Sequence, residues 1–249
     1  MSMLPCTKEI IERTERLTGK PVHLEEDRSL PVISRIQIVR GPARMHRLQY
    51  RPLPEGTPNY FICFQCGFII RLYENPPDER FDFEATADAP MRMQALLRGN
   101  PASSQLKGML LDGLMTQLRS MPIGMRIDDW LFRDYPELRL QQVAAAKAQL
   151  RDNSRALAPE IRRQVPKPVY TANAAMNSAF ALYWAKSLAD DSISLPYKST
   201  GFQPKGEALM GIFEKVESAP AEDRKLVDSW AEEVGLNGWY RWIPHRTEG

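Results

Sequence analysis

Two cysteines at C-x-x-C spacing, Cys63 and Cys66, lie in the apolar segment 60–73 on either side of a lone amide, Gln65. Residues three apart on a helix share a face, so the two thiols are able to reach one metal ion or each other. A structural zinc site needs four ligands, and no second cysteine pair repeats the spacing. A redox dithiol needs an exposed first thiol, whereas Cys63 has apolar neighbours. We therefore expect two buried cysteines acting as small hydrophobic residues, with a metal or thiol site as alternatives.

The three histidines are far apart in the sequence, so there is little support for a Ser/His/Asp or Cys/His catalytic triad. His46 falls in a predicted strand, and an exposed or hydrogen-bonded role is expected there. His245 is expected in a loose tail. Adjacent carboxylates such as Asp128 and Asp129 are expected to be solvated or to cap a helix, because neighbouring residues on a helix face different ways. An enzyme that uses His46 or the two cysteines stays an alternative.

The elements that position these residues are a helix, three short strands and a second helix. Thr7 is a candidate N-cap for a helix that runs to about Leu17. A short strand over 21–26 follows, and then two segments with partial period-2 alternation, 33–39 and 44–50, predict a hairpin. Asn59 is a candidate N-cap for a helix over 59–73, which Asn75-Pro-Pro ends.

This order of elements resembles the small zincin-like metallopeptidases of the ImmA/IrrE type over residues 7–73. In that family the buried helix carries H-E-x-x-H. The segment Cys63-Phe-Gln-Cys-Gly-Phe-Ile-Ile70 keeps the glycine, Gly67, and the apolar frame. Phe64 falls where the first histidine would be, Gln65 where the glutamate would be, and Phe68 where the second histidine would be.

The resemblance implies a degenerate metallopeptidase fold with its motif lost. In the intact motif, two histidines hold zinc and the glutamate takes a proton from the metal-bound water. Phenylalanine offers no lone pair, and glutamine is not a general base. We therefore expect no catalytic residues, no metal and no cofactor, and we expect Phe64 and Phe68 to fill the former cleft as core.

Residues beyond 86 show helical patterns and no strand pattern. A break is expected at Met121-Pro-Ile-Gly124, and the Ala-rich segment 170–188 is expected to be the central helix of a bundle. The fold class is therefore α+β, with a small N-terminal three-stranded sheet followed by a mostly helical region. The predicted domains are 1–85 and 86–249, or one continuous domain. The predicted helices are 91–98, 103–119 (with Ser103 or Ser104 as the first residue), 127–135, 136–157, 170–188, 205–216 and 220–234.

The composition and charge of the chain limit the classes of protein to which it can belong. The chain has 249 residues, 43% hydrophobic and 26% charged, which is ordinary for a soluble globular protein. Its formal net charge of +2 argues against a dedicated nucleic-acid binder. No apolar segment approaches the roughly 18 residues that span a bilayer, and the N-terminus lacks a signal-peptide pattern. We expect a cytoplasmic protein with no membrane contact.

The C-terminal segment Trp239-Tyr240-Arg241-Trp242 is expected to dock on the chain's own helices or on a partner, because Trp, Tyr and Arg are common interface anchors. Our leading hypothesis is a non-catalytic protein that binds a protein partner. By analogy with the family it resembles, it would be a bacterial regulatory or defence-system subunit. A nucleic-acid-associated subunit is an alternative that uses two basic clusters. They comprise Arg35, Arg40, Arg44, Arg47 and Arg51, and Arg151, Arg155, Arg162, Arg163 and Lys167.

Overall fold

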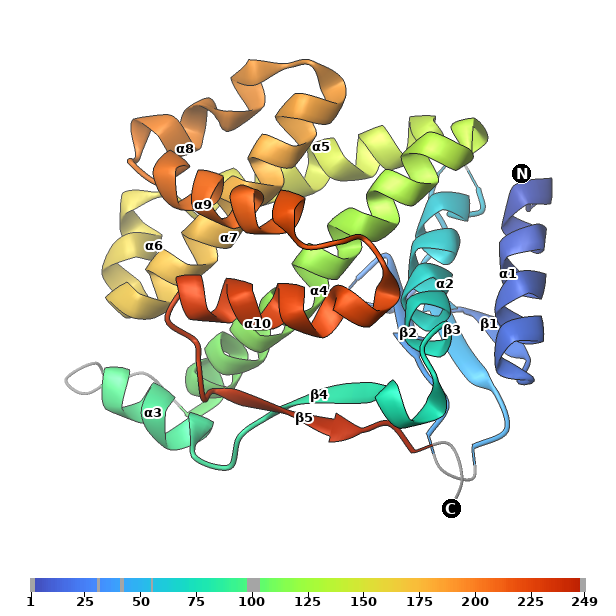
Figure 1. Ribbon diagram of the computed structural model, residues 1–249. Coiled ribbons are helices and arrows are strands. Elements are labelled where there is room, and N and C mark those ends of the chain that lie inside the picture. The colour runs from blue at the N-terminus through green and yellow to red at the C-terminus, as the bar shows by residue number, and fades with distance from the viewer. Residues whose placement is uncertain (1–2, 31, 41–42, 55, 98–103, 247–249) are drawn as a thin grey trace. The chain divides into compact units, whose positions relative to one another are not determined.

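The computed structural model describes the chain except residues 1–2, 31, 41–42, 55, 98–103 and 247–249 (Figure 1). The predicted α+β class is confirmed. The chain divides into two compact units. The first comprises Met1–Asp82, Arg126–Ala145 and Pro244–Gly249, and the second comprises Phe83–Met125 and Ala146–Ile243. The division of the sequence after residue 85 stays a prediction about domains.

The first unit is built on a three-stranded sheet with strand order β1-β3-β2. β3 pairs in parallel with β1 and antiparallel with β2, where Ser34 lies opposite Tyr50. The predicted hairpin is therefore confirmed. Figure 1 shows α1 beside α2. The bounds are α1 Pro5–Thr18, β1 Val22–Glu26, β2 Ser34–Gln37, β3 His46–Tyr50 and α2 Asn59–Tyr73.

The N-terminus of α2 is held by other elements rather than by its own cap. The Oδ1 atom of Asn59 accepts hydrogen bonds from the Leu4 backbone N–H and the Thr7 hydroxyl, both at 2.9 Å. The Tyr60 N–H instead donates to Oε1 of Gln141 at 2.9 Å. The predicted caps are therefore wrong, and α1 begins at Pro5 rather than after Thr7. The side chains of Thr7 and Asn59 join α1 to α2, and the local sequence does not reveal this role.

The second unit is mostly helical. Fourteen of the 22 residues of α7 (Lys167–Leu188) are buried, which agrees with the predicted central helix. α7 packs against α9 (Gln203–Lys215), and the fully buried Trp230 of α10 (Asp223–Glu233) donates from Nε1 to the Leu209 carbonyl at 3.1 Å. The remaining helices of the chain are η1 Pro77–Glu79, α3 Ala89–Leu96, α4 Ser104–Asp134, η2 Pro136–Leu138, α5 Arg139–Arg155, α6 Pro159–Gln164, η3 Asp191–Ser194, α8 Leu195–Ser199 and η4 Pro220–Glu222.

Two predictions for the later part of the chain are wrong. α4 continues through Pro122 instead of breaking there. Proline removes one helical N–H, but the burial of Leu118 and Met125 on either side stabilises the helix across this position. A strand also follows residue 86, because β5 (Tyr240–Pro244) pairs with β4 (Phe81–Ala85). The predicted helix limits at Arg98 and Ser103 lie outside the described residues.

Gly67 permits a close approach within the first unit. A Cβ atom built on Gly67 would lie 2.6 Å from Cγ2 of Ile127, which is fully buried. A side chain at this position would therefore have to displace Ile127. The glycine is needed for packing of α2 against residues 126–134 of α4.

We predict that Gly67→Ala lowers the free energy of unfolding by about 1–3 kcal/mol, because the added methyl overpacks the contact with Ile127. Combining it with Ile127→Ala should give a loss smaller than the sum of the two single losses. The control is Gly113→Ala in α4, where a Cβ meets nothing within 4 Å and is expected to stabilise the chain by roughly 0.5–1 kcal/mol. Urea denaturation measures all four variants, and strictly additive losses would contradict the packing role.

Candidate functional site

The positions that match the lost motif lie on two faces of α2. Tyr60, Phe64 and Phe68 form a row, with ring centroids 5.7 Å apart for the first pair and 5.3 Å for the second. Phe64 and Phe68 are only half-buried. The expectation that they fill a cleft as core is therefore wrong. Their spacing of four residues instead places the two rings edge to face along one partly exposed stripe of the helix.

Gln65 faces the sheet. Its Nε2 atom donates to the Ser34 hydroxyl at 3.0 Å and to the Ser34 carbonyl at 3.4 Å, which links α2 to β2. A glutamate at this position would bring a carboxylate against that carbonyl oxygen. The amide is thus matched to a structural hydrogen bond, and it is not placed to take a proton from a water molecule.

All three cysteines are buried and unbridged. The Cys63 thiol lies 3.5 Å from the Thr7 hydroxyl, between α2 and α1. Burial is the main cause that raises the pKa of Cys63 far above its usual range and the pKa of Cys66 to about 12. Because the thiolate is the nucleophile and the metal ligand, neither residue is prepared for that chemistry at neutral pH.

The structure brings together a cluster in the first unit that the sequence did not predict. His46 is fully buried and hydrogen-bonded, which agrees with one of its two expected roles, whereas His245 is buried rather than in a loose tail. Both rings contact Tyr73 edge to face, at centroid distances of 5.8 and 5.9 Å. His245 Nδ1 lies 3.0 Å from Asp82, which also pairs with Arg40 at 2.8 Å. We call His46, Tyr73, Asp82 and His245 the histidine cluster.

Hydrogen bonding assigns the tautomers in the histidine cluster. His46 Nδ1 accepts from the Val39 backbone N–H at 3.1 Å, so the neutral ring carries its proton on Nε2. His245 donates from Nδ1 to the Asp82 carboxylate. A metal ion needs a lone pair from each ring, and His46 has none to offer. Within the described ranges, no group of three or more His, Cys, Asp or Glu side chains is arranged to hold a metal ion.

Charge and burial set the pKa values in this cluster. Burial, with smaller contributions from the positive charges of His245 and Lys20, lowers the pKa of His46 to about 4. Burial alone would raise the pKa of Asp82, but its hydrogen bond to His245 and the charges of His245 and Arg40 lower it on balance. His46 Nε2, Tyr73 Oη and His245 Nε2 are buried and have no hydrogen-bond partner among the residues that the structure describes. Each such atom costs about 1–3 kcal/mol.

A second buried group in the first unit is Asp128, which was expected to be solvated or to cap a helix. It is 3% exposed, and its Oδ1 atom accepts from the Tyr60 hydroxyl at 2.7 Å and from Nε2 of Gln142 at 3.0 Å. Burial outweighs these hydrogen bonds and raises the pKa of Asp128 to about 7. Oε1 of Gln142 is buried without a partner among the described residues, so a hydrogen-bond donor at position 128 would satisfy it.

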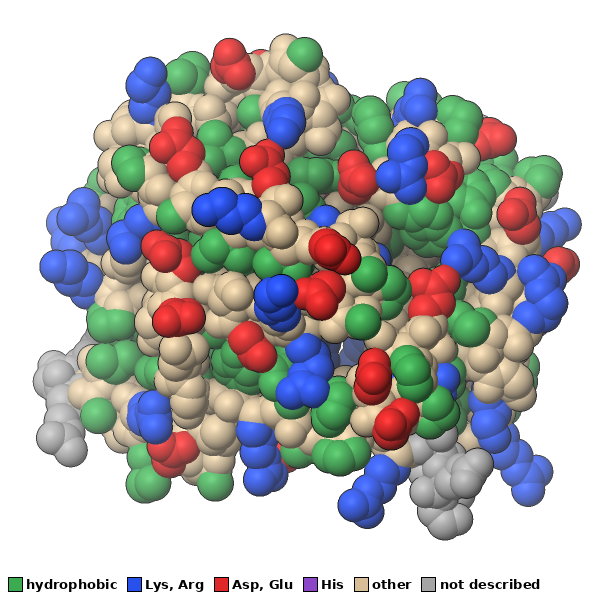
Figure 2. Space-filling view, viewed as in Figure 1, with side chains coloured by type: hydrophobic (Ala, Val, Ile, Leu, Met, Phe, Trp, Pro, Cys, Tyr) green, Lys and Arg blue, Asp and Glu red, His purple; other side chains and the backbone are tan. Residues whose placement is uncertain are grey.

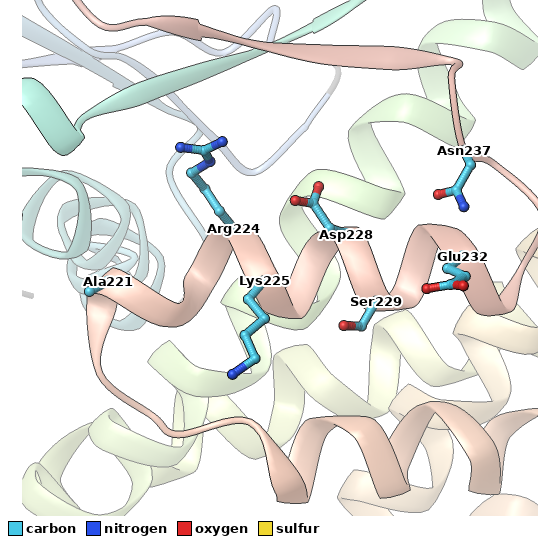
Figure 3. Close-up of a pocket in the computed structure, with 7 residues that line it drawn as sticks. All are labelled: Ala221, Arg224, Lys225, Asp228, Ser229, Glu232 and Asn237. Carbon is cyan, nitrogen blue, oxygen red and sulfur yellow. The ribbon is translucent and has the colours of Figure 1, made fainter.

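The second unit contains a surface cavity of about 470 Å³ along α10 (Figure 3). Its lining carries cations at Arg224 and Lys225 and an anion at Glu232, and Asn237 lies on the connection to β5. Arg224 and Asp228 point toward β5, and Lys225 points the other way. The cavity lining therefore carries charges of both signs.

Residues 239–242, the segment predicted to make contacts, reach this cavity by hydrogen-bonding to Asp228 in its lining. The Asp228 Oδ1 atom accepts from the Tyr240 hydroxyl at 2.6 Å and from Trp242 Nε1 at 2.8 Å. Tyr240 and Trp242 are half-buried, Trp239 is buried, and Arg241 is exposed and pairs with Glu84 at 3.0 Å. Arg224 also lies over the Trp242 ring, 5.6 Å from its centroid. The segment thus docks on its own α10, and two of its aromatic rings remain partly exposed.

The basic clusters are largely paired with nearby polar side chains. Arg47 pairs with Glu25 at 2.9 Å, and Arg35 donates to Gln49. Arg155 and Arg163 pair with acids on their own helices, Asp152 and Glu160. Figure 2 shows both signs of charge interspersed over the visible face. Within the described residues, several cations of each cluster therefore have polar partners on the chain itself.

Comparisons of the chain with protein-family models, with curated proteins and with solved structures find no match. The likeness to zincin-like peptidases therefore depends on the sequence features alone. No helix within the described ranges is both long enough and apolar enough to cross a membrane.

We predict that Asp128→Asn stabilises the chain increasingly as pH rises. The folded-state pKa of about 7 exceeds the ordinary value of 3.8, so the stability that protonated Asp128 contributes is fully present below about pH 4 and is lost through pH 7. The wild type should lose up to about 1.4 kcal/mol per pH unit in this window relative to the variant. Denaturation at pH 5 and pH 8 measures the difference.

The matched control is Asp129→Asn, because Asp129 is the exposed neighbour on the same helix and pairs with Arg133. It should track the wild type at both pH values. An Asp128→Asn variant whose stability relative to wild type is the same at pH 5 and pH 8 would show that Asp128 is ionised in the folded chain.

Proposed function

We propose that the chain is a non-catalytic protein that binds a partner protein through the α10–β5 surface, defined as the cavity-lining side chains of α10 with Asn237, Tyr240 and Trp242. The observation that carries this proposal is the position of Asp228. One carboxylate both lines the cavity and holds the two aromatic side chains. The cavity and the predicted contact segment therefore belong to one surface.

The residue types on this surface support recognition of a protein. Tyrosine, tryptophan and arginine dominate the energetics of protein interfaces, and a ring whose polar atom is already fixed loses little freedom on binding. Tyr240 and Trp242 are fixed in this way by Asp228. The cations Arg224 and Lys225 and the anion Glu232 favour a partner segment with charges of both signs.

The chemistry of α2 supports a role without catalysis. Phe64 and Phe68 present rings where zinc ligands would be, Gln65 is bonded to Ser34, and the thiols are held protonated by burial. Descent from a metallopeptidase-like fold, and a role as a regulatory or defence-system subunit, enter from the resemblance and stay part of the proposal. The enzyme alternative would use Cys63, Cys66 or His46, and all three side chains are fully buried.

Photo-crosslinking tests the proposed surface. A benzoylphenylalanine at Ser229, which lines the cavity, should capture one protein from the cells that naturally make this chain. Lys225→Glu in the same background should reduce the yield at least tenfold, because it reverses a charge in the lining. The control positions the crosslinker at the exposed Glu214 of α9 and should capture nothing specific. Equal capture from both positions, or no capture from Ser229, would contradict the proposal.

A further inference from the structure

The C-terminal residues 244–246 are attached to the first unit by His245. Its ring is fully enclosed, Nδ1 contacts Asp82 at 3.0 Å, and its backbone N–H donates to the Arg80 carbonyl at 2.8 Å. Beyond this ring lie Tyr73 and His46, each with a buried polar atom that has no partner in the described part of the chain. The attached conformation therefore leaves three buried polar atoms unsatisfied, on Tyr73 and on the two histidine rings that contact it.

The charges that face this point come from several segments. Lys20 precedes β1, Arg40 follows β2, and Arg80 lies over the Tyr73 ring with its guanidinium carbon 4.4 Å from the centroid. Asp82 on β4 supplies the negative charge that pairs with Arg40 and His245. A proton added to His46 would place another positive charge among these groups, away from water. The attached conformation consequently disfavours protonation of His46.

We propose that residues 244–246 form a latch that acid opens: withdrawal of His245 gives water access to His46, which then accepts a proton that the closed latch excludes. This device is independent of the α10–β5 surface. Opening of the latch removes the cost of burying unpaired polar atoms, because His46 Nε2 and Tyr73 Oη gain water as a hydrogen-bond partner. The closed latch is the neutral state of His46, and the open latch is the protonated state.

The direction of the pH effect follows from linkage. The pKa of His46 is about 4 in the closed conformation and 6.5 for an exposed ring. The open conformation therefore binds more protons between these values, and the opening equilibrium constant rises up to about tenfold for each unit that pH falls from 6.5 to 4. Because His245 and Asp82 contact each other in the closed conformation, a variant at position 46 is needed to isolate the effect of His46.

Hydrogen exchange of the His245 amide, read by NMR and corrected for intrinsic rates, tests the latch in the full chain. Protection in the wild type should fall at least tenfold between pH 7 and pH 5, while the amide of the buried Leu48 keeps its protection. His46→Gln should abolish the decrease, since glutamine does not titrate. His23→Gln is the matched control, because His23 is exposed on the neighbouring strand, and it should behave as wild type.

Parallel loss of protection at His245 and Leu48 would mean global unfolding and would overturn the proposal, as would an unchanged decrease in His46→Gln. A second variant keeps the test decisive if His46→Gln does not fold. In His245→Ala the pKa of His46, measured from its ring proton shifts, should move from about 4 toward 6.5. A pKa that stays near 4 in that variant would show that His245 does not cover His46.

Discussion

The packing of α2 within the first unit is the constraint on which the other features depend. Gly67 allows Ile127 to approach the helix axis, and α1 covers the face that carries the thiols. Most buried polar groups on or beside such a helix find partners inside the protein. Gln65 finds Ser34, and Asp128 finds Tyr60 and Gln142. The segment that could have carried hydrolytic chemistry therefore serves as a support.

This constraint leaves two kinds of polar burial with different consequences. The Asp128 network joins α2 to α4 and α5 through hydrogen bonds and resists local opening. The histidine cluster lies under a short terminal segment and includes three atoms without partners in the described ranges. Regions with unsatisfied groups and few anchoring contacts open at the lowest free energy. The surface that we propose for recognition, built from α10 and β5, is a feature of the second unit.

Sequence patterns predicted the elements whose causes are local. Alternation over 33–39 and 44–50 gave the hairpin, and Asn75-Pro-Pro marked the end of α2. Contacts between distant segments decided the rest: packing carries α4 through Pro122, and pairing with β4 makes a strand of residues 240–244. Asp128 was missed, although Met125 and Leu131, three residues away on either side, are buried on the same helical stripe. His245 left no such signal, because its burial depends on Asp82 and Tyr73.

The central claim is that α2 is a packed supporting helix where a zinc-binding helix is expected from the resemblance. Metal content of the purified full chain tests it most directly, by elemental analysis after mild dialysis and again after incubation with zinc and removal of the excess. The account predicts well under one zinc per chain in both samples, because Phe64 and Phe68 offer no lone pair and the thiols are held protonated. One tightly held zinc per chain, lost on substitution of Cys63 and Cys66, would contradict it.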